Sequence, residues 1–136
     1  MKRLVIMRGL PGSGKSTKAA TIQPEKHYRC SADDYHIFDG VYQWKPENVH
    51  AAHKWCQSKC HTLMGQGISP IVIDNTNIKK KDFAFYVEMA ALFGYTVEYA
   101  QSDTEWAWNV EECAKRNTHN VPLFVVERMK NDFQEI

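Results

Sequence analysis

The feature that most restricts the fold of this chain is a short apolar run followed at once by a glycine-rich turn. Residues 3–8 form a continuous run of the kind found in strands buried on both faces. The turn after it satisfies the pattern G-x-x-x-x-G-K-[ST], with Gly9, Gly14, Lys15 and Ser16 at the fixed positions. Such a loop binds phosphate when it lies between a buried strand and a helix. The sequence therefore predicts a phosphate-binding loop.

Each part of this loop has a physical reason to contact a nucleoside triphosphate. Gly12 and Gly14 let the backbone turn so that N–H groups point inward, and the following helix adds its positive end. We expect Lys15 to bridge the β- and γ-phosphates of ATP, Ser16 to ligate Mg²⁺ and Thr17 to contact the α-phosphate. The predicted ATP-binding residues are Gly9, Gly12, Ser13, Gly14, Lys15, Ser16 and Thr17.

Size and composition narrow the class of protein. The 136 residues, 43% of them hydrophobic, fit one domain with one buried core, expected to span 1–136. The formal net charge is +1, so any nucleic-acid contact requires a local basic patch. No run approaches the roughly 20 apolar residues of a membrane span, and the N-terminal run is too short for a signal peptide. We therefore expect a cytoplasmic protein without a membrane segment.

Apolar runs alternate with helical stretches, which predicts parallel β/α units in an α/β fold. The expected strands are 3–8, 27–31, 70–73 and 95–100. The expected helices are 15–23, 47–64, 77–93 and two more after residue 104, separated near 120–122. Asn77 is expected as an N-cap and Gly94 as the residue that ends the same helix. The segment 38–46 is expected to be a loop.

Three carboxylates follow two of the predicted strands. Asp33 and Asp34 come after the second strand and Asp74 after the third. Ligands of open α/β sheets bind outside the carboxyl ends of the strands, so these side chains are expected near the phosphate loop. We expect Asp33 to act as the general base for an acceptor hydroxyl. We expect Asp74, which follows four apolar residues, to hold the water shell of Mg²⁺ beside Asn75.

Structural roles are the alternatives for two of these acids. Ser31 with an acid three residues on fits a capping box, in which Asp34 would help to cap the next helix. Such a box does not use Asp33. For Asp74 the alternative is a helix N-cap. The sequence leaves both alternatives open.

Three further residues are candidates with competing explanations. Arg116 lies late in the chain, where small kinases carry a mobile lid, and an Arg there can neutralise charge on a transferred phosphoryl group. The alternative is a surface Arg. Tyr42 and Trp44 lie in the expected loop and could stack on bases, although core packing is the commoner use of such rings.

One predicted helix carries four potential metal ligands, spaced so that they share a face: His50, His53, Cys56 and Cys60. A tetrahedral zinc site could use such residues, but one helix rarely supplies four ligands and no loop-borne CxxC pair is present. We expect buried thiols and helix-packing histidines instead. The four cysteines of the chain are expected to be free.

Four runs occur in an order that covers nearly the whole chain: Arg8–Thr17, Ser31–Tyr35, Asp74–Asn77, and Lys115–Asn117 with Val121-Pro122. Together they resemble the 5′-hydroxyl polynucleotide kinases of the bacteriophage type. The likeness is greater still to the small P-loop kinase domains of that superfamily, found as phage proteins or fused to Smr-type nuclease domains. The phosphate loop alone is a strong motif, whereas the other three are specific only in combination.

This resemblance implies a three-layer P-loop kinase fold, with a parallel sheet of about four or five strands and a C-terminal helical lid. It implies transfer of the γ-phosphate of ATP, with Mg²⁺, to the 5′-OH end of DNA or RNA. It assigns the general base to Asp33, phosphate contacts to Lys15 and Ser16, and a lid contact to Arg116. The neighbouring motif residues are the candidates for substrate binding: Asp34, His36, Asn75 and Asn77.

The chain departs from the phage pattern at three places. His36 stands where the phage kinase has an Arg shortly after its DDY. Asn75 stands where the phage kinase has an acid before Thr-Asn, and Asp74 comes one place earlier. Of the basic residues between Arg-Asn and Val-Pro in the lid, only His119 remains. The reaction class is therefore a firmer prediction than the acceptor.

Two other functions fit parts of the sequence. A kinase for a nucleoside, nucleotide or sugar nucleotide agrees better with the near-neutral charge. A nucleotide-gated binding module would need the phosphate loop but no base at Asp33. The preferred NTP and the oligomeric state are left open.

Overall fold

A parallel sheet forms the centre of the structure, a computed structural model that describes residues 1–136. Its strands are β1 (Arg3–Met7), β2 (Arg29–Cys30), β5 (Ile71–Ile73) and β6 (Thr96–Ala100). They lie in the order β2-β5-β1-β6, and every neighbouring pair is parallel. Leu4 of β1 is paired with Ile71 on one side and Val97 on the other. The predicted α/β fold is confirmed, with four strands in the sheet.

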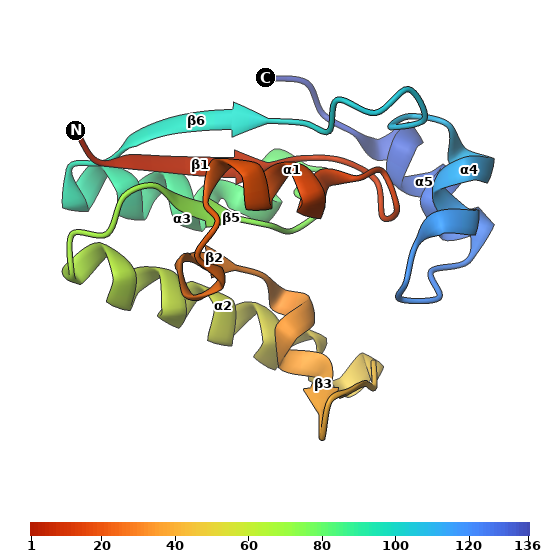
Figure 1. Cartoon of the computed structure of the whole chain (residues 1–136), viewed down its shortest axis with the longest axis horizontal. Coiled ribbons are helices and arrows are strands. Elements are labelled where there is room, and N and C mark those ends of the chain that lie inside the picture. Colours follow the sequence, from red (N-terminus) through yellow and green to blue (C-terminus); the bar gives the residue numbers. More distant parts are fainter.

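Helices cover both faces of this sheet. Successive side chains of β1 point to opposite faces, and the apolar side chains on each face are buried against helices. The helices are α1 (Lys15–Ile22), α2 (Val49–Gly65) and α3 (Lys80–Phe93). Leu4 and Ile6 are buried in the larger core cluster with side chains of α2 and α3. Val5 and Met7 are buried in a smaller cluster with Ala19 of α1. These two clusters fill the space between the sheet and the helices on either face, so the helices and the sheet form three layers (Figure 1).

Two C-terminal helices lie beyond the carboxyl ends of β1 and β6, toward which the strand arrows point in Figure 1. They are α4 (Val110–Arg116) and α5 (Leu123–Asp132). A third apolar cluster joins these helices, the lid, to the phosphate loop through Leu10, Ile78, Cys113 and Val126. The prediction of two helices after residue 104 is confirmed. None of the helices is both long and apolar enough to cross a bilayer.

The segment 38–46, expected to be a loop, is largely a hairpin. The structure has β3 (Ile37–Phe38), β4 (Val41–Tyr42) and then a 3₁₀ helix at Pro46–Asn48. The two strands pair antiparallel, and Asp39 and Gly40 between them have φ of 52° and 78°. Asp-Gly favours tight hairpin turns because both central positions need positive φ. That dipeptide is the local signal that predicts the hairpin.

The predicted cap at Asn77 is wrong. The cap of α3 is Lys79, whose backbone N–H donates to Oδ2 of Asp82 at 2.9 Å. Asn77 is buried with φ 48°, and its Nδ2 donates to the carbonyl of Met7 at 2.7 Å. The amide satisfies the end of β1, which is why Asn77 is not available to a helix.

The chain after β2 also differs from the expected pattern. The strand is shorter than the predicted 27–31, and a 3₁₀ helix follows it at Ala32–His36. Ser31 precedes that helix, but its side chain makes no capping hydrogen bond, so the capping box with Asp34 is wrong. The turn closes through backbone atoms instead, with Asp34 N–H bonded to Ser31 C=O at 3.2 Å.

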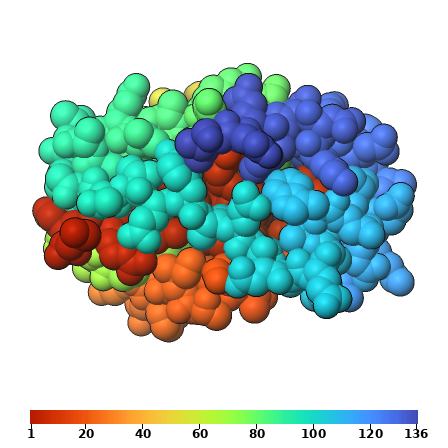
Figure 2. Space-filling view, turned by 90° about the horizontal axis from the view of Figure 1, so that it is seen from above, coloured from red at the N-terminus to blue at the C-terminus, as the bar shows by residue number.

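Arg8 ties the C-terminal tail to the beginning of the phosphate loop. Its guanidinium donates to the carbonyls of Asn77, Ile78 and Gln134 at 2.8, 2.9 and 2.7 Å. The same group lies 4.3 Å from the ring centroid of Phe133. Figure 2 shows the dark blue tail packed beside the red N-terminal segment. Arg8 therefore has a structural role.

Candidate active site

The glycine-rich loop turns sharply between β1 and α1. Gly12 and Gly14 have φ of 79° and 94°, in the left-handed region that residues with a Cβ avoid. Gly14 is the N-cap of α1, and no side chain caps this end of the helix. The first N–H groups of α1 are therefore available to an anion. Ser16 and Thr17, both exposed in the first turn, add two hydroxyls.

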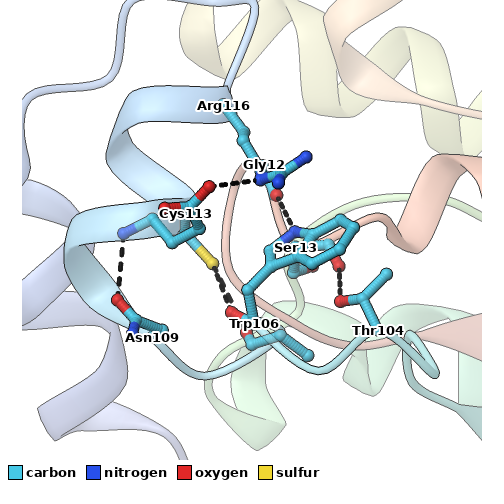
Figure 3. A network of polar contacts seen from close by, with 9 residues as sticks. Gly12, Ser13, Thr104, Trp106, Asn109, Cys113 and Arg116 are labelled. Carbon is cyan, nitrogen blue, oxygen red and sulfur yellow. Dashed lines mark hydrogen bonds and ion pairs between the residues drawn. The ribbon is translucent and has the colours of Figure 1, made fainter.

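A segment after β6 braces the outside of this loop (Figure 3). Thr104 Oγ1 donates to the carbonyl of Ser13 at 2.7 Å, and Trp106 Nε1 donates to the carbonyl of Gly12 at 3.1 Å. Trp106 is held in turn by α4, because its carbonyl accepts from the thiol of Cys113 at 3.2 Å. These contacts connect the phosphate loop to the segment after β6 and, through Trp106, to α4.

Gly12 leaves no room for a side chain. A Cβ built on it would lie 2.2 Å from the carbonyl oxygen of Cys113 and 2.8 Å from the nitrogen of Asn117. The Asn117 N–H donates a hydrogen bond to the Cys113 carbonyl at 2.9 Å at the end of α4, so neither group shifts easily. The glycine therefore lets the lid lie directly on the phosphate loop.

Lys15 and Asp74 form the floor of the site. Lys15 Nζ is 3.9 Å from Asp74 Oδ1, and each side chain is 10% exposed. Asp74 Oδ1 is buried without a hydrogen-bond partner, a costly state that a cation relieves. Carboxylate and hydroxyl oxygens, which Asp74 and the predicted ligand Ser16 carry, are the kind of ligands that Mg²⁺ prefers in proteins. Asp74 caps no helix, because α3 begins only at Lys80.

Hydrogen bonds between strand ends bring Asp33 to the same edge of the sheet. Asn75 Oδ1 accepts from the backbone N–H of Ala32 at 2.9 Å. The N–H of Asp74 donates to the carbonyl of Cys30 at 2.8 Å. Asn75, a predicted substrate-binding residue, thus uses its side-chain oxygen to hold the turn that carries Asp33.

Asp33 lies between a histidine of the lid and a tyrosine of the hairpin. Its Oδ2 is 3.2 Å from Nδ1 of His119, and its Oδ1 accepts from the Tyr42 hydroxyl at 3.4 Å. Burial raises the pKa of Asp33, but His119, followed by Lys15 and His36, outweighs burial and places the pKa below its ordinary value. Asp33 is therefore ionised at neutral pH, as a proton acceptor must be.

The imidazole of His119 also stacks on the ring of Tyr42, with centroids 4.1 Å apart and planes inclined by 21°. Burial, followed by the charge of Asp33, raises the pKa of Tyr42, so its hydroxyl stays protonated. These contacts join the loop between α4 and α5 to the hairpin. The sequence analysis missed them, since no local signal links two residues so far apart.

A cavity of about 970 Å³ lies between these elements. Its walls come from the phosphate loop, α1, the chain after β2 and β5, the hairpin, α2 and the lid. The predicted site residues that line it are Gly12, Gly14, Lys15, Ser16, Thr17, Asp33, His36, Asn75 and Arg116. Residues assigned to the nucleotide and residues assigned to the acceptor thus share one space.

The other predicted residues lie outside the lining: Gly9, Ser13, Asp34, Asp74 and Asn77. Asp74 is next to the cavity through Lys15. Asn77, which the resemblance makes a substrate contact, is instead engaged with the carbonyls of Met7 and Asn75 at 2.7 and 3.3 Å. Its polar atoms are used to close the backbone at the end of β1.

Arg116 ends α4 and lines the cavity. Its guanidinium lies 3.8 Å from the ring centroid of Trp106, and its Nε donates to Glu112 at 2.7 Å. The pair with Glu112 is 47% and 34% exposed, so it is weak and opens at little cost. Arg116 is therefore placed beside the phosphate loop with a charge that a ligand can recruit.

The thiols of α2 pack the helix as expected, but the expected packing role of its histidines is wrong, because His50 and His53 are both exposed. Cys56 and Cys60 are fully buried in the core, and burial raises the pKa of Cys56 to about 11. His53 lines the cavity. No three His, Cys, Asp or Glu side chains are placed to share a metal ion.

Comparisons with known proteins match nearly the whole chain. The family described as AAA domain (AAA_33) matches residues 4–136. Human NEDD4-binding protein 2 is 38% identical over 133 residues, which are 96% of this chain and 8% of that protein. The 2′,3′-cyclic-nucleotide 3′-phosphodiesterase of Rattus norvegicus is 30% identical over 132 residues, which are 95% of this chain and 30% of that protein.

Among solved structures, a chain in "Structure of Pnkp1/Rnl/Hen1 complex" is similar with a TM-score of 0.62 and 26% identity. The match covers 85% of this chain and 38% of that chain. The three-layer α/β arrangement is therefore a P-loop kinase fold. In all three cases the chain spans well under half the length of the protein it matches.

Proposed function

We propose that this chain, which belongs to the AAA domain family, is a kinase that uses ATP and Mg²⁺ to phosphorylate the 5′-OH end of DNA or RNA. The observation that carries this proposal is the single cavity shared by Lys15, Ser16 and Asp33. A triphosphate held by the loop and a hydroxyl held by Asp33 would meet there. A nucleotide-gated binding module has no need of an ionised carboxylate opposite its phosphate loop.

The residues of the cavity supply complementary parts of phosphoryl transfer. Asp33 is ionised and 45% exposed, so it can accept the proton of the acceptor hydroxyl. Lys15 stabilises negative charge that develops on the transferred group, and Arg116 adds a second positive charge from the lid. Ser16 and Asp74 would hold Mg²⁺, which neutralises phosphate charge when bound.

The relatives agree with an acceptor that contains a nucleotide. One relative is named for 2′,3′-cyclic nucleotides, and the similar structure is described as a complex of Pnkp1, Rnl and Hen1. The 5′-OH end itself is proposed from the resemblance of Ser31–Tyr35 and Asp74–Asn77 to the phage-type kinases. The net charge of +1 favours a small acceptor instead, so a nucleoside or sugar nucleotide is the second candidate.

The decisive experiment is transfer of label from γ-labelled ATP. The acceptors are a single-stranded oligonucleotide with a 5′-OH, the same oligonucleotide with a 5′-phosphate, and a set of nucleosides and sugar nucleotides. We expect label only on the 5′-OH oligonucleotide, and only with Mg²⁺. If only a nucleoside is labelled, the protein is still a kinase, but the proposed acceptor is wrong. If the protein binds ATP but labels no acceptor, the nucleotide-gated binding module is the function that agrees with the result.

A further inference from the structure

The acceptor side of the cavity carries aromatic rings that catalysis by Asp33 does not require. Tyr42 and Trp44 of the hairpin segment both line the cavity, and Trp44 is 52% exposed. The ring of His36 is close to both, with its centroid 5.9 Å from that of Tyr42 and 6.5 Å from that of Trp44. Aromatic rings beside a phosphate-binding site are one means by which proteins hold unpaired bases.

An unused polar atom accompanies these rings. His36 is 3% exposed, lines the cavity, and its Nδ1 has no hydrogen-bond partner. A buried polar atom without a partner is rare and needs a reason. A group that enters the cavity and hydrogen-bonds to His36 would supply one. This second observation indicates a ligand at the hairpin side, separate from the phosphate loop.

From this arrangement we propose that the ring of Tyr42 is the stacking surface for the terminal nucleobase of the acceptor, and that His119 covers this surface until the base displaces it. The proposal rests on the proposed function and names its acceptor as a single-stranded end. The observation that carries it is the near-parallel stack of the two rings, 4.1 Å between centroids and 21° between planes. The flat imidazole lies where a flat base would lie.

Displacement of His119 has a direct effect on Asp33. Nδ1 of the same imidazole is 3.2 Å from Asp33 Oδ2. When the His119 ring moves off the Tyr42 ring, it therefore also uncovers the Asp33 carboxylate. The histidine and Asp33 are 35% and 45% exposed, and ion pairs this exposed are weak. A stacked base is worth more than such a pair. Binding of the base thereby prepares the carboxylate for the acceptor hydroxyl.

The test measures binding without ATP, by anisotropy of a 3′-labelled single-stranded oligonucleotide that has either a normal or an abasic 5′-terminal nucleotide. In the wild type, the abasic change should weaken binding roughly tenfold, within the range of about 5- to 150-fold typical of one stacked base. Tyr42→Leu should weaken the normal oligonucleotide by a similar factor and leave the abasic one unchanged. Tyr42→Phe, the matched control, keeps the ring and should bind like the wild type.

His119→Ala should tighten binding of the normal oligonucleotide several-fold and leave the abasic one unchanged, because it removes a competitor for the ring. Equal losses on both oligonucleotides in Tyr42→Leu, or weaker binding in His119→Ala, would overturn the proposal. If the expected binding pattern appears but no label is transferred to the 5′ end, the stacking surface stands and the kinase assignment fails. If label is transferred without the pattern, the kinase assignment stands and the stacking surface fails.

Discussion

Lys15 Nζ and Asp74 Oδ1 are separated by 3.9 Å, too far for a hydrogen bond, yet both side chains are buried, Lys15 in the wall of the cavity and Asp74 directly behind it. The separation leaves the carboxylate oxygen without a partner and the ammonium free to face the cavity. The unpartnered oxygen and the unpaired ammonium are each available to a bound ligand or cation.

Lys15→Ala should reduce phosphoryl transfer by about 10²–10³-fold, because it removes the charge nearest the developing negative oxygens. The measurement is label transfer under saturating ATP. Lys18→Ala is the matched control, since Lys18 lies one turn along α1 outside the cavity lining and pairs with Asp103. Transfer within tenfold of wild type in a folded Lys15→Ala variant would remove Lys15 from the assignment.

Asp33→Asn should keep ATP affinity and lose about 10²–10⁴-fold in rate, the usual effect of removing a general base. Calorimetry measures the first quantity and label transfer the second. Asp34→Asn is the control, because Asp34 neither lines the cavity nor forms the capping box. A wild-type rate in Asp33→Asn, with a loss in Asp34→Asn, would transfer the role to Asp34.

The acid limb of kcat/KM should lie below the ordinary Asp pKa of about 3.9, because the pKa of Asp33 is lowered in the folded chain. His119→Gln should move that limb to higher pH, since burial is then less opposed. The same lowered pKa affects stability. Ionised Asp33 stabilises the fold at pH values above the ordinary Asp pKa, and this stabilisation is lost as the pH falls through the pKa of Asp33 in the folded chain. An unchanged limb in His119→Gln would mean that His119 does not act on Asp33.

Gly12→Ala should lower the free energy of unfolding by about 2–4 kcal/mol, because strain at positive φ adds to a clash with α4. Gly67→Ala isolates the strain, since Gly67 has φ 71° and no neighbour within 4 Å of a built Cβ. It should cost about 1 kcal/mol. Urea denaturation measures both. Equal losses would show that α4 yields to the added methyl group.

Asn77→Ala should destabilise the chain by about 1–3 kcal/mol, because it leaves the carbonyl of Met7 buried without its donor. KM for the acceptor should stay at the wild-type value. Chemical denaturation and steady-state kinetics separate the two effects. A raised KM with unchanged stability would return Asn77 to the substrate-binding set.

Several expectations were correct because their cause is local. The loop before Lys15 follows from its glycines and the apolar strand before them, and the carboxyl-end position of Asp33 follows from the order of strands. The hairpin at Asp39 and Gly40, expected to be a loop, also has a local signal in its Asp-Gly dipeptide. Helix starts were less certain: the amide of Asn77 could cap a helix or close β1, and both are hydrogen bonds of similar strength.

The sequence by itself determined the phosphate loop, the alternating β/α units and the strand ends that carry the acids, because each follows from a pattern of residues adjacent in the chain. Only the tertiary structure decided that α4 lies directly on Gly12, that Asn77 closes β1, and that His119 covers Tyr42 and Asp33. Those contacts join residues far apart in sequence. They form only when the lid and the hairpin pack around the same cavity, which no local pattern encodes.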